Sequence, residues 1–120
     1  MGLDVDFYVD DKEVEYMRKC WHLFNTAYAF CLIRDDGKKT DDKDEQFRIA
    51  YSIGSAMGHS SAGWFEVTND EWGKIINKAL ETEKQKWAEA WGFHDYRRED
   101  YLKQSRELLK YDKMKIKWVN

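Results

Sequence analysis

The stretch from Glu13 to Arg34, EVEYMRKCWHLFNTAYAFCLIR, carries the densest apolar pattern in the chain. Read at helical spacing, its apolar side chains recur at steps of three and four along two neighbouring stripes. One stripe holds Val14, Met17, Trp21, Phe24, Tyr28 and Cys31, and the other holds Tyr16, Cys20, Leu23, Ala27 and Phe30. Two adjacent stripes make a face wider than a surface helix needs. The pattern therefore predicts a central helix over 13–34 that other elements cover on two sides, with His22 on its narrow, solvated polar edge.

Both ends of the chain alternate apolar and charged residues with a period of two, which indicates strands. Residues 3–9 place aspartates on one face, and residues 113–119 place lysines on one face. Oppositely charged cross-strand neighbours stabilise a sheet. We therefore expect the first and last strands to be adjacent, with their apolar faces on the central helix and a short strand at 64–67 as third member.

The remaining periodic segments predict helices. One begins near Asp42 or Asp44 and is rich in small residues. A second follows a capping box formed by Thr68 and Glu71 and extends to Trp91. A third follows Asp95. The predicted fold class is α+β: one domain over 1–120, with a small three-stranded sheet (strands near 3–9, 64–67 and 113–119) packed on about four helices.

Composition narrows the class of protein. The net charge is −3, with −5 in residues 1–45 and +2 in residues 46–120, too weak a balance to argue by itself for nucleic-acid binding. No apolar run reaches the ~18–20 residues of a membrane span. Two cysteines eleven residues apart within one predicted helix are too distant for a disulfide. We expect a cytoplasmic protein with no membrane contact.

Residues for partner binding are expected in two places. The acidic loop between the first two helices is one, because acidic groups can occupy a surface built for phosphate. The tryptophan-bearing end of the helix predicted to extend from the capping box to Trp91 is the other. These candidates are Asp35, Asp36, Asp41, Asp42, Asp44, Glu45, Trp87 and Trp91. The loop does not fit a calcium-binding pattern, and no residue spacing predicts a metal site or a cofactor.

Two alternatives remain open. The segment 97–117 has eight basic and four acidic residues, and a basic stripe on its helix could follow a nucleic-acid backbone. That stripe consists of Arg97, Arg98, Lys103, Arg106 and Lys110. The other alternative is a small phosphate-ester hydrolase, for which the available groups are His22, His59 and His94 with Ser60 and Ser61. No nucleophile motif or metal-ligand spacing accompanies them, so the sequence favours a non-catalytic protein.

The opening Met1-Gly2-Leu3-Asp4, followed by an alternating strand, resembles a loose group of small phage and prophage proteins. Members often continue with a helix containing a Tyr-x-Arg-Lys segment, here residues 16–19, and end in a short aromatic strand, as Trp118 does here. The resemblance covers about the first 30 residues and the last few. It implies a phage-like origin and no particular activity.

These observations together favour a small binding protein that inhibits or modulates a host protein or ribonucleoprotein complex. An anti-CRISPR or another anti-defence protein fits this description. The wide apolar face of 13–34 would be covered either within one chain or by a second copy, so the sequence leaves the oligomeric state open.

Overall fold

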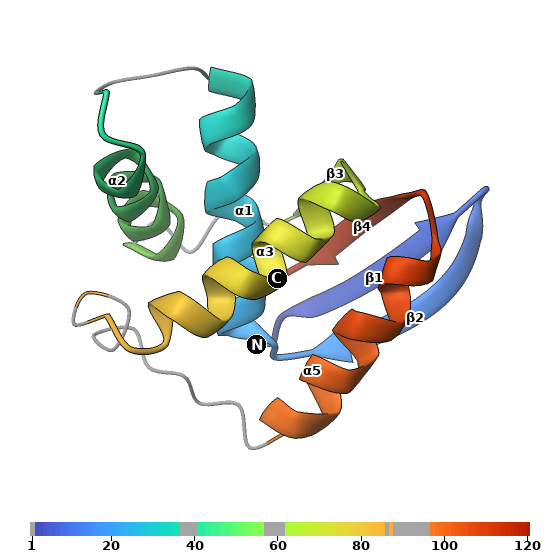
Figure 1. The fold of residues 1–120 in the computed structure, drawn as a ribbon. Helices are drawn as coiled ribbons and strands as arrows, with labels where there is room; N and C mark the ends of the chain where they lie inside the picture. The colour runs from blue at the N-terminus through green and yellow to red at the C-terminus, as the bar shows by residue number, and fades with distance from the viewer. Residues whose placement is uncertain (1, 37–40, 57–61, 86, 88–96) are drawn as a thin grey trace.

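The computed structural model describes residues 2–36, 41–56, 62–85, 87 and 97–120. This part of the chain has an α+β fold in which four α-helices and a short 3-10 helix accompany a sheet of four antiparallel strands (Figure 1). In chain order the elements are β1 (Asp4–Val9), β2 (Lys12–Arg18), α1 (Trp21–Asp36), α2 (Lys43–Ala56), β3 (Ala62–Thr68), α3 (Asn69–Thr82), α5 (Arg98–Glu107), η1 (Leu108–Lys110) and β4 (Lys113–Val119). No helix within these ranges is long and apolar enough to cross a membrane.

The predicted pairing of the first and last strands is confirmed. The strand order is β2-β1-β4-β3, so β1 and β4 are neighbours at the centre of the sheet. Asp6 on β1 lies opposite Lys117 on β4. The third expected strand is also present, because β3 pairs with the other side of β4.

The sheet has four strands, not three, because the first part of the predicted central helix is a strand. Residues 12–18 form β2 and the helix begins only at Trp21. Asp10 and Asp11 have φ values of 50° and 67°, which makes them a two-residue hairpin turn of the kind that suits twisted strands. The segment 16–19 therefore lies in β2 and the turn after it, not in the helix that the resemblance implied.

A bulge explains why this strand looked helical. The register between β1 and β2 shifts between Phe7 and Tyr8. The extra residue on β2 lets both Val14 and Met17, three residues apart, contact the core. Apolar residues three apart are the usual mark of a helix, so the bulge imitates helical spacing.

The main core lies between one face of the sheet and the helices α1, α3 and α5 (Figure 1). Trp118 from β4 packs against Phe24 of α1 and Phe65 of β3, with ring centroids 5.3 and 5.4 Å apart. Trp72 of α3 meets Phe7 of β1 edge to face at 5.6 Å. Aromatic side chains thus occupy the centre of the core, where they bury the most apolar area.

A second, smaller apolar cluster joins α2 to α1. Its buried members are Ala29, Phe47, Ala50 and Tyr51. Helix α2 contacts α1 and lies away from the sheet (Figure 1). The core is therefore divided: one cluster covers the sheet and another holds a single helix.

Helix α3 begins as predicted. The Thr68 hydroxyl accepts from the backbone N–H of Glu71, and the Glu71 carboxylate accepts from the backbone N–H of Thr68. The helix ends earlier than expected, at Thr82 instead of Trp91. The segment 81–86 has no large apolar side chain, so continued helix there would gain little from tertiary packing.

Candidate functional site

Four of the six acidic residues predicted to bind a partner lie around the connection between α1 and α2. Asp35 and Asp36 are the last residues of α1, and Asp35 accepts a hydrogen bond from Arg34 at 3.0 Å. Asp41 and Asp42 are exposed just before α2. Because the C-terminus of a helix favours cations, two aspartates at the end of α1 do not serve helix stability.

Asp42, Asp44 and Glu45 have local partners around the start of α2. The carboxylate of Asp42 accepts from the backbone N–H groups of Asp44 and Glu45, at 2.9 and 3.3 Å. Asp44 pairs with Lys78 of α3 at 2.9 Å, and Glu45 pairs with Arg48 at 2.5 Å. Together with the Arg34–Asp35 pair, these contacts account for four of the six acidic residues as a helix cap and surface ion pairs.

Trp87 is half-buried and packs on α2. Its ring lies 5.1 Å from Tyr51 and 6.1 Å from Phe47, centroid to centroid. Its partner in the prediction, Trp91, lies outside the described residues, as do His59, Ser60, Ser61 and His94.

The basic residues of the segment 97–117 do not form a continuous stripe. Arg98 forms ion pairs with Glu83 and Glu99, which raise the pKa of its guanidinium. The ammonium group of Lys110 lies over the ring of Tyr111. Arg98 and Lys110, both predicted nucleic-acid contacts, are therefore engaged within the chain.

Arg97 is exposed at the N-cap of α5, and Lys103 and Arg106 are exposed on the helix itself. Arg97 and Lys103 border an open groove of about 450 Å³ between β2 and α5. The groove also has acidic groups, from Glu15, Asp100 and Glu107. It therefore carries both signs of charge, whereas a phosphate backbone binds best to a predominantly basic surface.

The prediction that His22 lies on a solvated edge is wrong, because its side chain is 3% exposed. Its Nε2 donates to the carbonyl oxygen of Ala79 at 2.9 Å, and its Nδ1 accepts from the hydroxyl of Tyr51 at 3.0 Å. Burial lowers the pKa of His22. The imidazole is neutral and connects α1, α2 and α3, so it serves packing instead of acid–base chemistry.

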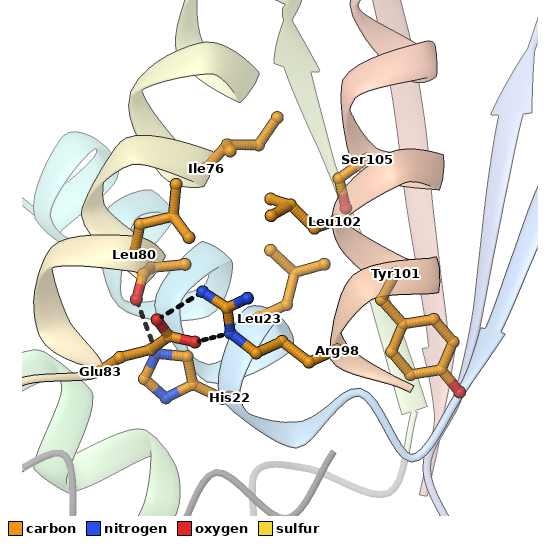
Figure 2. Close-up of a pocket in the computed structure, with 10 residues that line it drawn as sticks. His22, Leu23, Ile76, Leu80, Glu83, Arg98, Tyr101, Leu102 and Ser105 are labelled. Atoms are coloured by element: carbon orange, nitrogen blue, oxygen red, sulfur yellow. Dashed lines mark hydrogen bonds and ion pairs between the residues drawn. The ribbon is translucent and has the colours of Figure 1, made fainter. Parts of the chain in front are cut away.

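A cavity of about 30 Å³ adjoins His22 between α3 and α5 (Figure 2). Its lining is mostly apolar, with the Arg98–Glu83 ion pair beside the imidazole. The hydroxyl of Ser105 is buried on its wall and has no hydrogen-bond partner among the described residues. The volume admits about two water molecules, too few for a substrate. Within the described residues, no group of three or more His, Cys, Asp or Glu side chains is placed to hold a metal ion.

The largest exposed hydrophobic side chains lie mainly on the face of the sheet that the helices leave open, here called the outer face. Tyr16 on β2, Trp64 on β3 and Val119 on β4 are 43%, 57% and 56% exposed. Lysine side chains cover part of the aromatic surface: Lys115 lies over Trp64 at 4.3 Å, and Lys117 lies over a second ring, Tyr8, at 4.5 Å. Sequence alternation placed the lysines on this face, but Tyr16 could not be found because its segment was predicted to be helical.

The two central strands of the outer face carry opposite charges. β1 presents Asp4 and Asp6, and β4 presents three lysines; on β2, Glu13 contacts Asp6 and Arg18 is paired with Asp4. Burial and a hydrogen bond with Glu13 raise the pKa of Asp6 to about 6. The hydroxyl of Tyr16 donates to Asp4. Of the surfaces described, this one combines exposed aromatic rings with separated charges.

No protein-family model, no curated protein and no solved structure matches this chain.

Proposed function

We propose that the chain is a small non-enzymatic binding protein that acts by docking another macromolecule on the outer face. The observation that carries the proposal is the exposure of Tyr16 and Trp64 on a sheet face that the described helices do not cover. Tyrosine and tryptophan are enriched at the energetic centres of protein interfaces, because they offer a large contact area at low entropic cost.

The surroundings of these rings support the same function. Charged side chains lie between and around them, as the polar rim of a protein interface does around its apolar anchors. The two rings stand on the edge strands β2 and β3, each paired with one of the central strands β1 and β4, so the sheet holds both rings on one surface before binding. A preformed surface loses little entropy on association.

The partner is proposed to be a host protein or ribonucleoprotein complex, which the chain inhibits or modulates after expression from a phage. Support comes from the resemblance of about the first 30 residues and the last few to small phage proteins, and from the acidic end of α1. An anti-defence role, such as inhibition of a CRISPR complex, agrees with both features. Asp35, Asp41 and Asp42 would then steer a basic partner toward the chain.

Photo-crosslinking tests this function. A photoreactive phenylalanine at position 64 is expected to capture a host protein in cells, whereas the same group at Asn77, exposed on α3, captures none. The captured protein is then purified, and Trp64→Ala is expected to weaken its binding at least tenfold while Asn77→Ala leaves it unchanged. Equal capture from both positions would contradict the proposal, as would an affinity that Trp64→Ala leaves unchanged.

The two alternatives have weaker support. Nucleic-acid binding would rest on Arg97, Lys103 and Arg106, the first two of which border a groove that also has acidic groups. Labelled single-stranded DNA and RNA at low salt are therefore included as probes of the same purified protein. Phosphate-ester hydrolysis could not use His22 as its base, because this side chain is buried and hydrogen-bonded on both ring nitrogens; the other candidate histidines, His59 and His94, lie outside the described residues.

A further inference from the structure

One row of residues crosses the outer face from edge to edge. Tyr16 is paired with Asp6, Asp6 with Lys117, and Lys117 with Trp64. Directly paired residues on one face lie side by side. The row therefore reads aromatic, acidic, basic, aromatic from β2 to β3, and its two halves are chemically complementary.

We propose that a second copy of the chain docks on the outer face around a two-fold axis that runs parallel to the strands, between β1 and β4. The proposal rests on the assignment of this face as the binding surface. Such an axis reverses the order of the strands and keeps each row at its own height. Asp6 of one copy then meets Lys117 of the other, and Tyr16 meets Trp64, each contact occurring twice. This self-complementarity is what a symmetric dimer requires.

The charges select this axis over the other one that would bring the faces together. A two-fold axis across the strands, through the row that contains Asp6, would place each residue of that row opposite the same residue of the second copy. Asp6 would then face Asp6, and Lys117 would face Lys117. Like charges in direct contact disfavour such an arrangement, so of these two axes the one parallel to the strands brings opposite charges together.

The next row agrees in part. It contains Glu13, Tyr8, Lys115 and Glu66 in register. The proposed axis sets Lys115 over Tyr8 of the second copy, a favourable cation–π contact. It also sets Glu13 near Glu66, but Glu66 already pairs with Lys113 at 3.2 Å, which reduces the repulsion.

The size of the face predicts a reversible dimer. Four strands at about 4.8 Å spacing and roughly seven residues at about 3.3 Å each give a surface of about 19 by 23 Å. This is small beside the ~800 Å² that each partner buries in a standard interface. We therefore expect the dimer to dissociate on dilution.

Sedimentation of the purified chain, from micromolar to about 1 mM, is the test. The wild type is expected to change from monomer to dimer over this range. Asp6→Lys and Lys117→Glu are each expected to remain monomeric, because each creates two like-charge contacts in its own dimer. An equimolar mixture of the two variants is expected to form a heterodimer, since every central contact then joins opposite charges. Lys74→Glu, a charge reversal on α3, is the control that keeps wild-type behaviour, and circular dichroism checks that each variant is folded.

Recovery by mixing separates an interface from a folding defect, because mixing does not change repulsion within one chain. If the wild type is monomeric at every concentration, or if the mixture stays monomeric, the proposed dimer is wrong. Neither result affects host capture from position 64. Conversely, if a crosslink from position 64 captures only a second copy of this chain, the result contradicts the proposal of a host partner and supports the dimer.

Discussion

The buried imidazole of His22 makes stability depend on pH. Burial lowers the pKa of His22 in the folded chain below the 6.5 of an unfolded chain. As pH falls through about 6.5, the unfolded state binds the proton first, so the free energy of unfolding decreases. We expect denaturant titrations to show this contribution between about pH 7.5 and 5.5 as a difference between the wild type and a variant without the imidazole, because the raised pKa of Asp6 contributes with the opposite sign over the same range.

His22→Gln is the control for this dependence, because the amide does not titrate. It is expected to be less stable at every pH by about 1–3 kcal/mol, since Tyr51 and Ala79 lose a hydrogen-bond partner. Its stability should vary less over the same range. A variant with the wild-type slope would show that other groups cause the pH dependence.

Asp6 and Glu13 form a carboxyl pair whose titration can be followed separately. The pKa of Asp6 is raised to about 6, first by burial and then by its hydrogen bond and charge repulsion with Glu13. Glu13→Gln removes the charge and is expected to lower the pKa of Asp6 toward 3.8. Carboxyl chemical shifts measured against pH check this, and an unchanged pKa would assign the whole shift to burial.

Two glycines give opposite predictions for the same substitution. A Cβ on Gly63 would lie 2.5 Å from the Trp118 indole, which aromatic neighbours hold in place. Gly63→Ala is therefore expected to lower the free energy of unfolding by about 1–3 kcal/mol. Gly73→Ala in α3 meets only an ordinary contact, 3.7 Å from Leu109, and is expected to stabilise by about 0.5–1 kcal/mol. Urea titration of both variants measures the contrast, and losses of equal size would contradict it.

At the scale of single elements, the β1–β2 hairpin offers a test of its turn. Asp10 and Asp11 both adopt positive φ, which asparagine and glycine tolerate better. The double variant Asp10→Asn, Asp11→Gly is expected to raise the free energy of unfolding by about 1 kcal/mol. Asp70→Gly, in the first turn of α3, is the matched control and should destabilise. Thermal or urea unfolding measures both, and a destabilised hairpin variant would be inconsistent with the turn.

The elements that could be predicted from sequence are those with local, regular signals. Alternation located β1 and β4, and the Thr68–Glu71 pair located the start of α3. The prediction failed at β2 because a bulge depends on the pairing of two strands and cannot be recognised from the sequence of one strand alone. It also failed at the end of α3, which depends on the packing available after Thr82. These failures share one cause: tertiary pairing overrides local periodicity.

The site was less predictable than the fold for the same reason. The row across the outer face exists only through the register of four strands, and Tyr16 joins it only because residues 12–18 form a strand. The acidic loop and Trp87 were recognisable from composition, but composition does not reveal that Trp87 packs on Tyr51. Charge patterning predicted which strands meet, and not which rings would be exposed beside them.

At the scale of the whole molecule, the divided core predicts that stability is uneven. Helix α2 is held mainly by the small cluster around Phe47 and Tyr51, apart from the core on the sheet. Phe47→Ala is expected to speed amide hydrogen exchange in α2 selectively, because a local opening does not require the sheet to separate. Mass spectrometry of exchange checks this. A uniform acceleration in α2 and β4 would instead indicate one cooperative unit.

The central pairing of β1 with β4 also has a kinetic consequence. Asp4 lies opposite Val119, so the sheet's middle contacts join residues more than a hundred positions apart. Such contacts form late, because a long loop must close before they contribute. Joining Asn120 to Gly2 through a short linker and opening the chain elsewhere would convert the most distant pairing into a local hairpin. A circular permutant opened within the α1–α2 connection is therefore expected to refold faster than the original chain, in stopped-flow measurements, while keeping the same sheet.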